Sequence, residues 1–403
     1  MGAEWRNNIW MCLELIIVGL VLWFIATFMI TVLQPLLADK GYDVSTDIYV
    51  ADVRQIDKDS PVYTEYPDSL HDRQTDMAAL VRNMAANPYV EVVGTGVNAM
   101  PYNYNYSGNQ IRPIDGRDSV TYQGNLRFMS PGMVRVMRLQ GARGESPDSI
   151  AGMIERRQML VTHFDFGQSC PPEQLVGREV MWGNDSSHIY TVGAVARAIH
   201  RSDYEQIRDG VMYVDIPAGW LPDQLAVRVK PGMGRQFAES LKASDMEFGN
   251  VYLCNLKSIE QMRAWSHAAM NTAIRNMIVC AVFLLVAVFL GFLGTFWFRT
   301  QQRVPEIAVR IVNGATSRQI FNRLLTEGLL LLGFSSVVMA AVTCAVVYTG
   351  VLNDIDGIDF GGYRPYMALA ISVVLLIVII VAGTWMPARR AMKVSPALAL
   401  KDQ

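Results

Sequence analysis

The chain has 403 residues, of which 51% are hydrophobic and 18% are charged, and its formal net charge is -2. A mean hydropathy of +0.19 is too high for an ordinary soluble protein of this length. The near-neutral charge provides no overall attraction for nucleic acid, so we expect no nucleic-acid partner.

The first long apolar segment covers residues 9–33 and contains one acid, Glu14. A signal peptide has an apolar core of about 7–15 residues, followed by a cleavage site of small residues. Here the run is longer and leads into Gln34 and Pro35, which indicates a retained anchor within a first domain of residues 1–36. A bilayer crossing needs roughly 20 apolar residues. Three later segments also reach this length: residues 277–298, 324–352 and 366–386.

The charges between these spans predict the topology. Short loops rich in Lys and Arg stay on the cytoplasmic side. Arg6 precedes the first span, arginines crowd the loop after the second, and Arg389, Arg390 and Lys393 follow the fourth, whereas the loop between the third and fourth is acidic. We therefore expect a multi-pass membrane protein with both termini in the cytoplasm and residues 37–271 on the opposite face of the membrane.

The exported region is long enough to bury a core of its own. Near its start, Met77 and Leu80 recur on one helical face, with Ser69 and Asp72 as a capping box and a strand at residues 89–93. A helix followed at once by a strand indicates an α+β domain.

The middle of this region is predicted to be rich in strands. Tyr102, Tyr104 and Tyr106 alternate with asparagines, the period of a strand with one aromatic face, and a packed face is favoured over a sugar-stacking surface. We expect an insertion at residues 101–217 within an α/β subdomain built from residues 37–100 and 218–271. Further predicted strands are residues 159–162, 179–182, 190–195, 211–214, 225–229 and 251–255, with a helix at 234–244 and another from Asn255 onward into the second span.

No residues in the chain form a recognisable catalytic or metal site. His163 and Asp165 are the one close His–acid pair, and with Cys170 they do not supply the three or four converging ligands of a metal site. Cys170 and Cys254 both lie in the exported region, and their spacing neither requires nor excludes a disulfide. The chain lacks nucleophile-elbow, zinc-protease and phosphate-loop motifs. We predict neither an enzyme nor a bound cofactor, and any ATP must be held by another chain.

The loop after the second span is predicted to contain a short helix at about residues 304–316. Pro305 suits a first turn, Glu306 complements the positive N-terminal end of a helix, and Gly314 can end it. An apolar stripe that includes Ile307 favours docking into a groove of a cytoplasmic partner. The alternative is a surface helix whose arginines contact anionic lipid headgroups.

This loop resembles the signature of the MacB/FtsX-type (type VII) permeases of ABC transporters, where Arg-x-x-Glu-Ile-x-x-Arg precedes a Gly-Ala pair. The C-terminal tail at residues 386–398 is also similar to that family, as are residues 141–144, 175–178 and 192–195 of the exported region. The matching loop residues, which the resemblance implies to be ATPase-docking residues of a coupling helix, are Arg303, Glu306, Ile307, Arg310, Gly314 and Ala315.

The resemblance implies an α-helical membrane protein with four transmembrane helices, a large MacB-like α+β periplasmic domain between the first and second, and an FtsX-like permease domain at residues 272–403. It implies a permease subunit that transmits cytoplasmic ATP hydrolysis to the periplasmic domain, for export, extrusion or the handling of lipoproteins or peptides. The alternative is an FtsX-like signalling or scaffold protein that regulates a periplasmic partner such as a cell-wall hydrolase. The implied partners are a separate ABC ATPase subunit, a second permease copy or related permease, the lipid bilayer, and a periplasmic adaptor or outer-membrane component.

Overall fold

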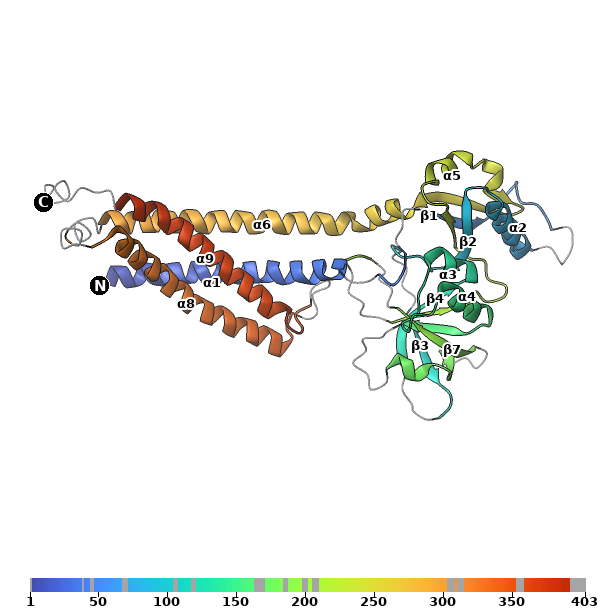
Figure 1. Ribbon diagram of the computed structural model, residues 1–403, viewed down its shortest axis with the longest axis horizontal. Helices are drawn as coiled ribbons and strands as arrows, with labels where there is room; N and C mark the ends of the chain where they lie inside the picture. The colour runs from blue at the N-terminus through green and yellow to red at the C-terminus, as the bar shows by residue number, and fades with distance from the viewer. Residues whose placement is uncertain are drawn as a thin grey trace. The chain divides into compact units, whose positions relative to one another are not determined.

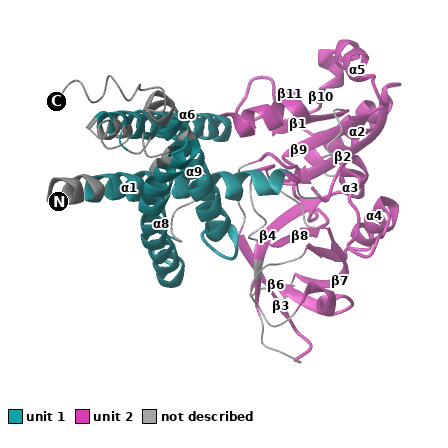
Figure 2. Ribbon diagram, turned by 60° about the vertical axis from the view of Figure 1, so that its left-hand side comes forward, with its two compact units in different colours: residues 1–36, 269–403 teal, residues 37–268 magenta. Residues whose placement is uncertain are grey.

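The protein divides into two compact units, shown in different colours in Figure 2. Residues 1–36 and 269–403 form one, here called the helical unit, and residues 37–268 form the other, here called the sheet unit. The computed structural model describes residues 2–37, 40–43, 47–66, 72–103, 108–116, 121–162, 171–183, 188–197, 202–204, 210–302, 309, 315–352 and 359–391.

The helical unit consists of long helices, labelled in Figure 1: α1 (Gly2–Leu33), the larger part of α6 (Ile259–Gln302), α8 (Ser317–Thr349) and α9 (Arg364–Ala391). Among the described residues, four helices are long and apolar enough to cross a membrane. These candidate spans are Ile9–Leu37, which includes the 3₁₀ turn η1 (Gln34–Leu37), and Ile259–Thr295, Phe321–Thr349 and Arg364–Trp385.

Both ends of α8 are fixed by local sequence. Thr316 and Gln319 form a capping box, in which each side chain accepts a hydrogen bond from the other residue's backbone N–H. Gly350 follows the last turn with a φ of 63°, which only glycine adopts without strain. The helix therefore begins and ends where its sequence directs.

The core of the helical unit is a single apolar cluster to which all its helices contribute, including Leu15 of α1, Phe292 of α6, Met339 of α8 and Leu376 of α9. Large apolar side chains on the outer faces of the helices stay exposed, for example Phe283. Such faces suit contact with lipid tails, which are as apolar as the side chains themselves.

The sheet unit is built from β1 and the elements between α2 and the start of α6, and its strands join into one sheet. The hydrogen-bonded order is β10-β11-β1-β9-β2-β4-β3-β6-β7-β5-β8. The bounds are β1 Ile48–Gln55, α2 Arg73–Ala85, β2 Val90–Val97, β3 Gly108–Pro113, β4 Tyr122–Met129, α3 Pro131–Met137, α4 Pro147–Glu155, β5 Met159–Thr162, η2 Pro172–Leu175, β6 Glu179–Trp182, β7 Ile189–Ala196, β8 Gly210–Val214, β9 Gln224–Val229, α5 Gly234–Ser240, η3 Ala243–Asp245, β10 Glu247–Phe248 and β11 Val251–Ser258.

One end of this sheet closes on itself. β4 pairs in parallel with β8, in addition to its antiparallel pairing with β3, so that β4, β3, β6, β7, β5 and β8 form a ring. An apolar cluster that includes Leu126, Val161 and Met212 draws on all of these strands. Closure of this kind removes the exposed sheet edges that invite misassembly.

The other end of the sheet is covered on both faces. Leu80 of α2 and Phe237 of α5 pack with Val227 of β9 in one cluster, whereas Met133 of α3 packs with Ala226 of β9 in another. Because successive residues of a strand point to opposite faces, β9 is buried along its whole length.

The predicted fold class is confirmed: four candidate transmembrane helices are present, and an α+β domain lies between the first and the second. Three local predictions need correction. Tyr102 lies in a turn with a φ of 61° instead of a strand. Residues 255–258 end β11 and do not begin α6, and the middle region contains helices α3 and α4 as well as strands. Tyr104 and Tyr106 lie outside the described residues.

Candidate functional site

The first turns of α6, residues 259–268, form the part of the helix that belongs to the sheet unit, and we call them the α6 root. The helix begins at Ile259 because Ser258 and Gln261 form a reciprocal cap. The Gln261 N–H donates to Ser258 Oγ at 3.2 Å, and the Ser258 N–H donates to Gln261 Oε1 at 3.1 Å. Ile259 itself is buried in the core of the sheet unit, so the root is fixed at its first residue.

Several polar and charged side chains near the α6 root contact the carboxylate of Asp203. Its carboxylate is fully buried, and Arg263 Nε donates to it at 2.5 Å. Lys40 Nζ lies 3.3 Å from its other oxygen, which also accepts a 3.0 Å hydrogen bond from the Tyr102 hydroxyl. His267, one turn beyond Arg263, places Nε2 3.4 Å from the carboxylate. We call these five residues the Asp203 cluster.

The cluster joins segments that are far apart in sequence. Lys40 follows the first candidate span closely, whereas Arg263 and His267 lie on the helix that continues into the second. One buried carboxylate thus holds both chain segments that connect the sheet unit to membrane spans. The rings of Tyr102 and Tyr204 pack edge-on against His267, with centroids 5.7 and 4.7 Å away.

Asp203 is ionised despite its burial. Burial alone raises the pKa of a carboxyl group, but the charges of Lys40 and Arg263 and the hydrogen bonds from Arg263 and Tyr102 outweigh it, so that the pKa of Asp203 lies below its ordinary value. For Tyr102, burial is the largest effect and raises the pKa to about 12. Its hydroxyl therefore stays protonated and remains a hydrogen-bond donor to Asp203.

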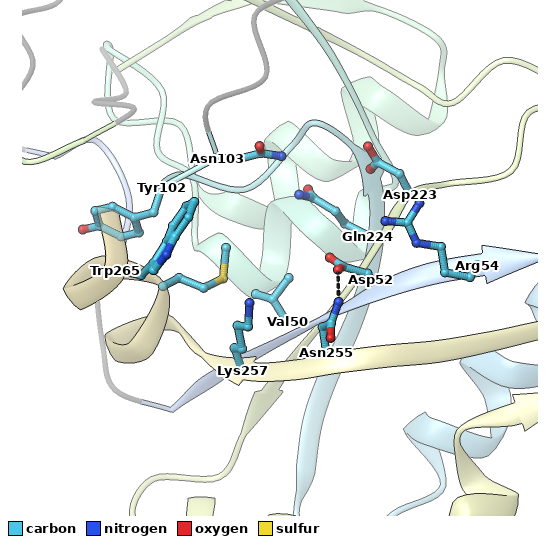
Figure 3. A pocket seen from close by; sticks show the side chains of 11 residues that line it. Val50, Asp52, Arg54, Tyr102, Asn103, Asp223, Gln224, Asn255, Lys257 and Trp265 are labelled. Carbon is cyan, nitrogen blue, oxygen red and sulfur yellow. Dashed lines mark hydrogen bonds between the residues drawn. The ribbon is translucent and has the colours of Figure 1, made fainter. Parts of the chain in front are cut away.

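A cleft of about 400 Å³ adjoins this cluster within the sheet unit. Tyr102 belongs to both, because its ring lines the cleft while its hydroxyl binds Asp203. The cleft is shown in Figure 3, and its lining residues come from β1, β11, the start of β9, the turn after β2 and the α6 root. Volumes of this size are typical of small-molecule sites.

Most of the residues singled out from the sequence are not tested by the structure, although Tyr102 lies in both the Asp203 cluster and the cleft. Of the predicted docking residues, Arg303, Glu306, Ile307, Arg310 and Gly314 lie outside the described residues. Ala315 is described, and it precedes the cap of α8 without belonging to a helix. The predicted coupling helix at residues 304–316 is therefore a proposal that we take up below.

The residues weighed for chemistry also fall largely outside the described ranges, since these omit His163, Asp165 and Cys170. Cys254 is described, and it is half-buried in β11. Within the described ranges, no three His, Cys, Asp or Glu side chains gather as metal ligands.

Sequence reasoning missed the Asp203 cluster and the cleft. The members of the cluster are separated by up to 227 positions (40 to 267) and follow no local pattern. A signal did exist for the two missed helices. Ser130-Pro131 and Ser146-Pro147 each place a capping serine before a proline in the first turn, and both serines accept a backbone hydrogen bond there.

Comparison with known proteins identifies the membrane part of the chain. Residues 278–396 match the family model described as "FtsX-like permease C-terminal". This stretch covers the membrane part of α6 and all of α8, together with α9 up to its end. No curated protein sequence matches the chain.

Two solved structures are weakly similar to it. The extracellular domain of the noncanonic ABC-type transporter YknZ from Gram-positive bacteria is 11% identical, with a TM-score of 0.30, over 51% of this chain and 100% of that one. The periplasmic region of MacB from Actinobacillus actinomycetemcomitans is 11% identical, with a TM-score of 0.30, over 58% of this chain and 97% of that one. Likenesses of this strength carry no functional conclusion.

The family match does not depend on these two structures. It covers the basic loop and overlaps the last three candidate spans, on which the predicted resemblance partly rests. That resemblance is confirmed for the membrane region: residues 278–396, which overlap the last three of the four candidate spans, match an FtsX-like permease.

Proposed function

We propose that this chain is the membrane permease subunit of an ABC transporter in which a separate ATPase drives movement of the exported sheet unit. The subunit works as a dimer with a second copy or a related permease, in a cell inner membrane with both termini in the cytoplasm. The motion serves export, extrusion or the handling of lipoproteins or peptides, through a periplasmic adaptor or outer-membrane component where one is present.

The observation that carries this proposal is the continuity of α6. It runs without a break from Ile259 to Gln302, from the sheet unit into the FtsX-like region. A continuous helix transmits displacement along its axis, whereas a flexible linker would absorb it. The Asp203 cluster supports the same role, because it holds the α6 root and the segment after the first span on one buried side chain.

At its C-terminal end α6 leads directly toward the basic loop. We propose that residues 304–316 form a coupling helix that docks on the ATPase through Arg303, Glu306, Ile307, Arg310, Gly314 and Ala315. The charges support this assignment, since a short basic loop between spans is retained in the cytoplasm, where ATP is available.

The test is a paired charge reversal at the proposed contact. Arg303→Glu with Arg310→Glu is made in the full chain, purified together with its ATPase and reconstituted into vesicles. The matched control is Arg235→Glu, an exposed arginine of the sheet unit. ATP hydrolysis stimulated by the permease is expected to fall at least about tenfold in the double variant, since two charge-assisted contacts are worth about 1.5–3 kcal/mol each. The control is expected to keep full stimulation.

A second measurement separates the proposal from the signalling or scaffold alternative. If no ATPase co-purifies with the chain, and the double variant behaves as the wild type in every assay, the results favour the scaffold function over the transporter function.

Side-specific labelling of a single cysteine at Val309 and another at Gly116 tests the topology. Labelling of both from the same side would end the proposal.

A further inference from the structure

The cleft of the sheet unit is lined by acidic, basic and apolar side chains whose roles differ. Val50, Asp52 and Arg54 alternate along β1 and therefore lie on one face of the sheet, and Lys257 stands opposite Val50 on β11. Trp265 of the α6 root lies at one end of the cleft (Figure 3), and Met262 of the same segment also lines it. Asp223, Gln224 and Asn103 are further lining residues.

The acidic and amide groups of the cleft hold the fold together. Asp52 accepts a 2.9 Å hydrogen bond from Asn255, drawn as a dashed line in Figure 3. Asp223 accepts from the backbone N–H of Asn98 at 3.1 Å, and Gln224 accepts from two further backbone N–H groups at 3.1 and 3.2 Å. Burial also raises the pKa of Asp223 above its ordinary value. These groups are therefore occupied.

The two cationic side chains that line the cleft, Arg54 and Lys257, have no such hydrogen-bond partners among the described residues. Within the described part of the chain, the side chains of Arg54 and Lys257 make no hydrogen bond or ion pair, and both residues are exposed. Arg54 lies near enough to Asp223 to affect its pKa, so its charge is partly balanced. Lys257 faces the apolar end instead, between Val50 and the α6 root. It is the side chain that an incoming anion would meet.

The apolar end is unusually open to solvent. Trp265 is 72% exposed, although an indole ring is one of the largest apolar surfaces that a side chain can offer. Met262, one turn before it, is half-buried and lines the same wall. A flexible thioether beside an open aromatic ring adapts to apolar groups of varied shape.

We propose that this cleft binds a small amphipathic anion, with its acidic group on Lys257 and its apolar chain against Trp265 and Met262. The two ligand-binding side chains of the α6 root alternate along the helix with Arg263 and His267, which face the Asp203 cluster. A ligand in the cleft therefore contacts the same helical turns that the cluster holds. The site lies wholly within residues 37–268 and is independent of any ATPase.

Binding is measured by isothermal titration calorimetry on the full chain in nanodiscs of zwitterionic lipid, with empty nanodiscs as the blank. The probes are hexyl phosphate and hexanoate, which separate a phosphate source from a carboxylate source. Inorganic phosphate supplies the charge alone, and hexyltrimethylammonium supplies the chain with the opposite charge. We expect at least one of the two amphipathic anions to bind, at least about tenfold more tightly than the last two probes. It is also expected to change Trp265 emission, a change that Trp265→Phe abolishes.

Variants locate the site. Lys257→Gln is expected to weaken binding about tenfold, because it removes the charge that the acidic group contacts. Trp265→Ala is expected to weaken it by a similar factor, because it removes most of the apolar wall; a tenfold change is about 1.4 kcal/mol. Arg54→Gln is expected to have a smaller effect because Asp223 partly balances that charge. Lys58→Gln, an exposed lysine just beyond β1, is the matched control and is expected to bind as the wild type.

Several results would overturn the proposal. These are the absence of binding by both amphipathic anions, equal binding of the cationic probe or of inorganic phosphate, and wild-type affinity in Lys257→Gln. Unchanged circular dichroism in each variant establishes that loss of binding is not loss of folding. Failure here would leave the ATPase proposal intact, because stimulated ATP hydrolysis is a separate measurement.

Discussion

Replacing Asp203 by asparagine perturbs the Asp203 cluster most sharply, because it keeps the size of the side chain and removes its charge. Lys40 is only 12% exposed, so its ammonium would lose its counter-charge with little water to replace it, at a cost of about 2 kcal/mol. Arg263 is 44% exposed, and solvent limits its loss to at most about 1 kcal/mol. The Tyr102 hydroxyl can still donate to the amide oxygen.

Asp203→Asn is therefore expected to destabilise the sheet unit by about 2–3 kcal/mol. For a domain of this size, each kcal/mol lowers the melting temperature by about 2–4 °C, which gives a decrease of about 4–12 °C. The assay is thermal unfolding of the full chain in nanodiscs, followed by tryptophan emission.

The matched control for this measurement is Asp148→Asn. Asp148 also binds an arginine, Arg135, at 2.9 Å, but its side chain is 83% exposed. Such surface pairs contribute about 0.2–1 kcal/mol, so the control is expected to melt within about 4 °C of the wild type. If Asp203→Asn melts together with this control, the cluster does not stabilise the sheet unit and the reasoning is wrong.

Three further predictions follow from other contacts. The pKa of Asp203 is lowered from its ordinary value of 3.8, so its contribution to stability is fully present above that pH and is lost as the pH falls through the lower folded-state pKa. The difference in melting temperature between wild type and Asp203→Asn should therefore be constant from about pH 8 to 5 and shrink below about pH 4. Gly94→Ala would place a methyl group 2.3 Å from the backbone of α3 and is expected to cost about 2–3 kcal/mol in thermal unfolding. Gly152→Ala, with its nearest atom at 3.5 Å, should be neutral or stabilising. Arg364→Gln removes the ion pair with Asp359 in the helical unit and is expected to raise hydrogen exchange of residues 31–34 about tenfold, equivalent to about 1.4 kcal/mol; unchanged exchange would contradict this.

Sequence patterns predict local elements of this protein well where the signal is itself local. β5 is a run of four apolar or β-prone residues and β6 has three such residues after Glu179, and both agree with the predicted residues 159–162 and 179–182. The spans follow from apolar length alone. The strand predicted at Tyr102 failed because alternation of aromatic and polar residues also occurs in a turn, where the ring is buried for tertiary reasons.

The candidate sites could not be predicted in the same way. The Asp203 cluster depends on which loops the sheet brings together, and Asp203 follows β7 while its partners precede β1, follow β2 and lie in α6. The cleft can be recognised only when the exposed side chains are known, and nothing in the sequence distinguishes an exposed tryptophan at position 265 from a buried one. The coupling-helix residues present the opposite case: their pattern is evident in the sequence, and the described residues do not test it.

The Asp203 carboxylate lies close to both connections between the sheet unit and the helical unit. The chain passes between the units twice, once just after α1 and once within α6. On the α1 side, Thr31 contacts Asp359 and Gln34 accepts a 2.8 Å hydrogen bond from Arg364, so the end of α1 is fixed to the start of α9 inside the helical unit. A few residues later Lys40 is held by Asp203 inside the sheet unit. Under the proposed function, movement of the helical unit would reach the sheet unit through these two connections, and Asp203 binds a residue close to each of them. If that proposal is right, Asp203→Asn should weaken the transmission of movement to the sheet unit while the ATPase still docks. Docking should persist because Arg303 and Arg310 are unchanged in this variant.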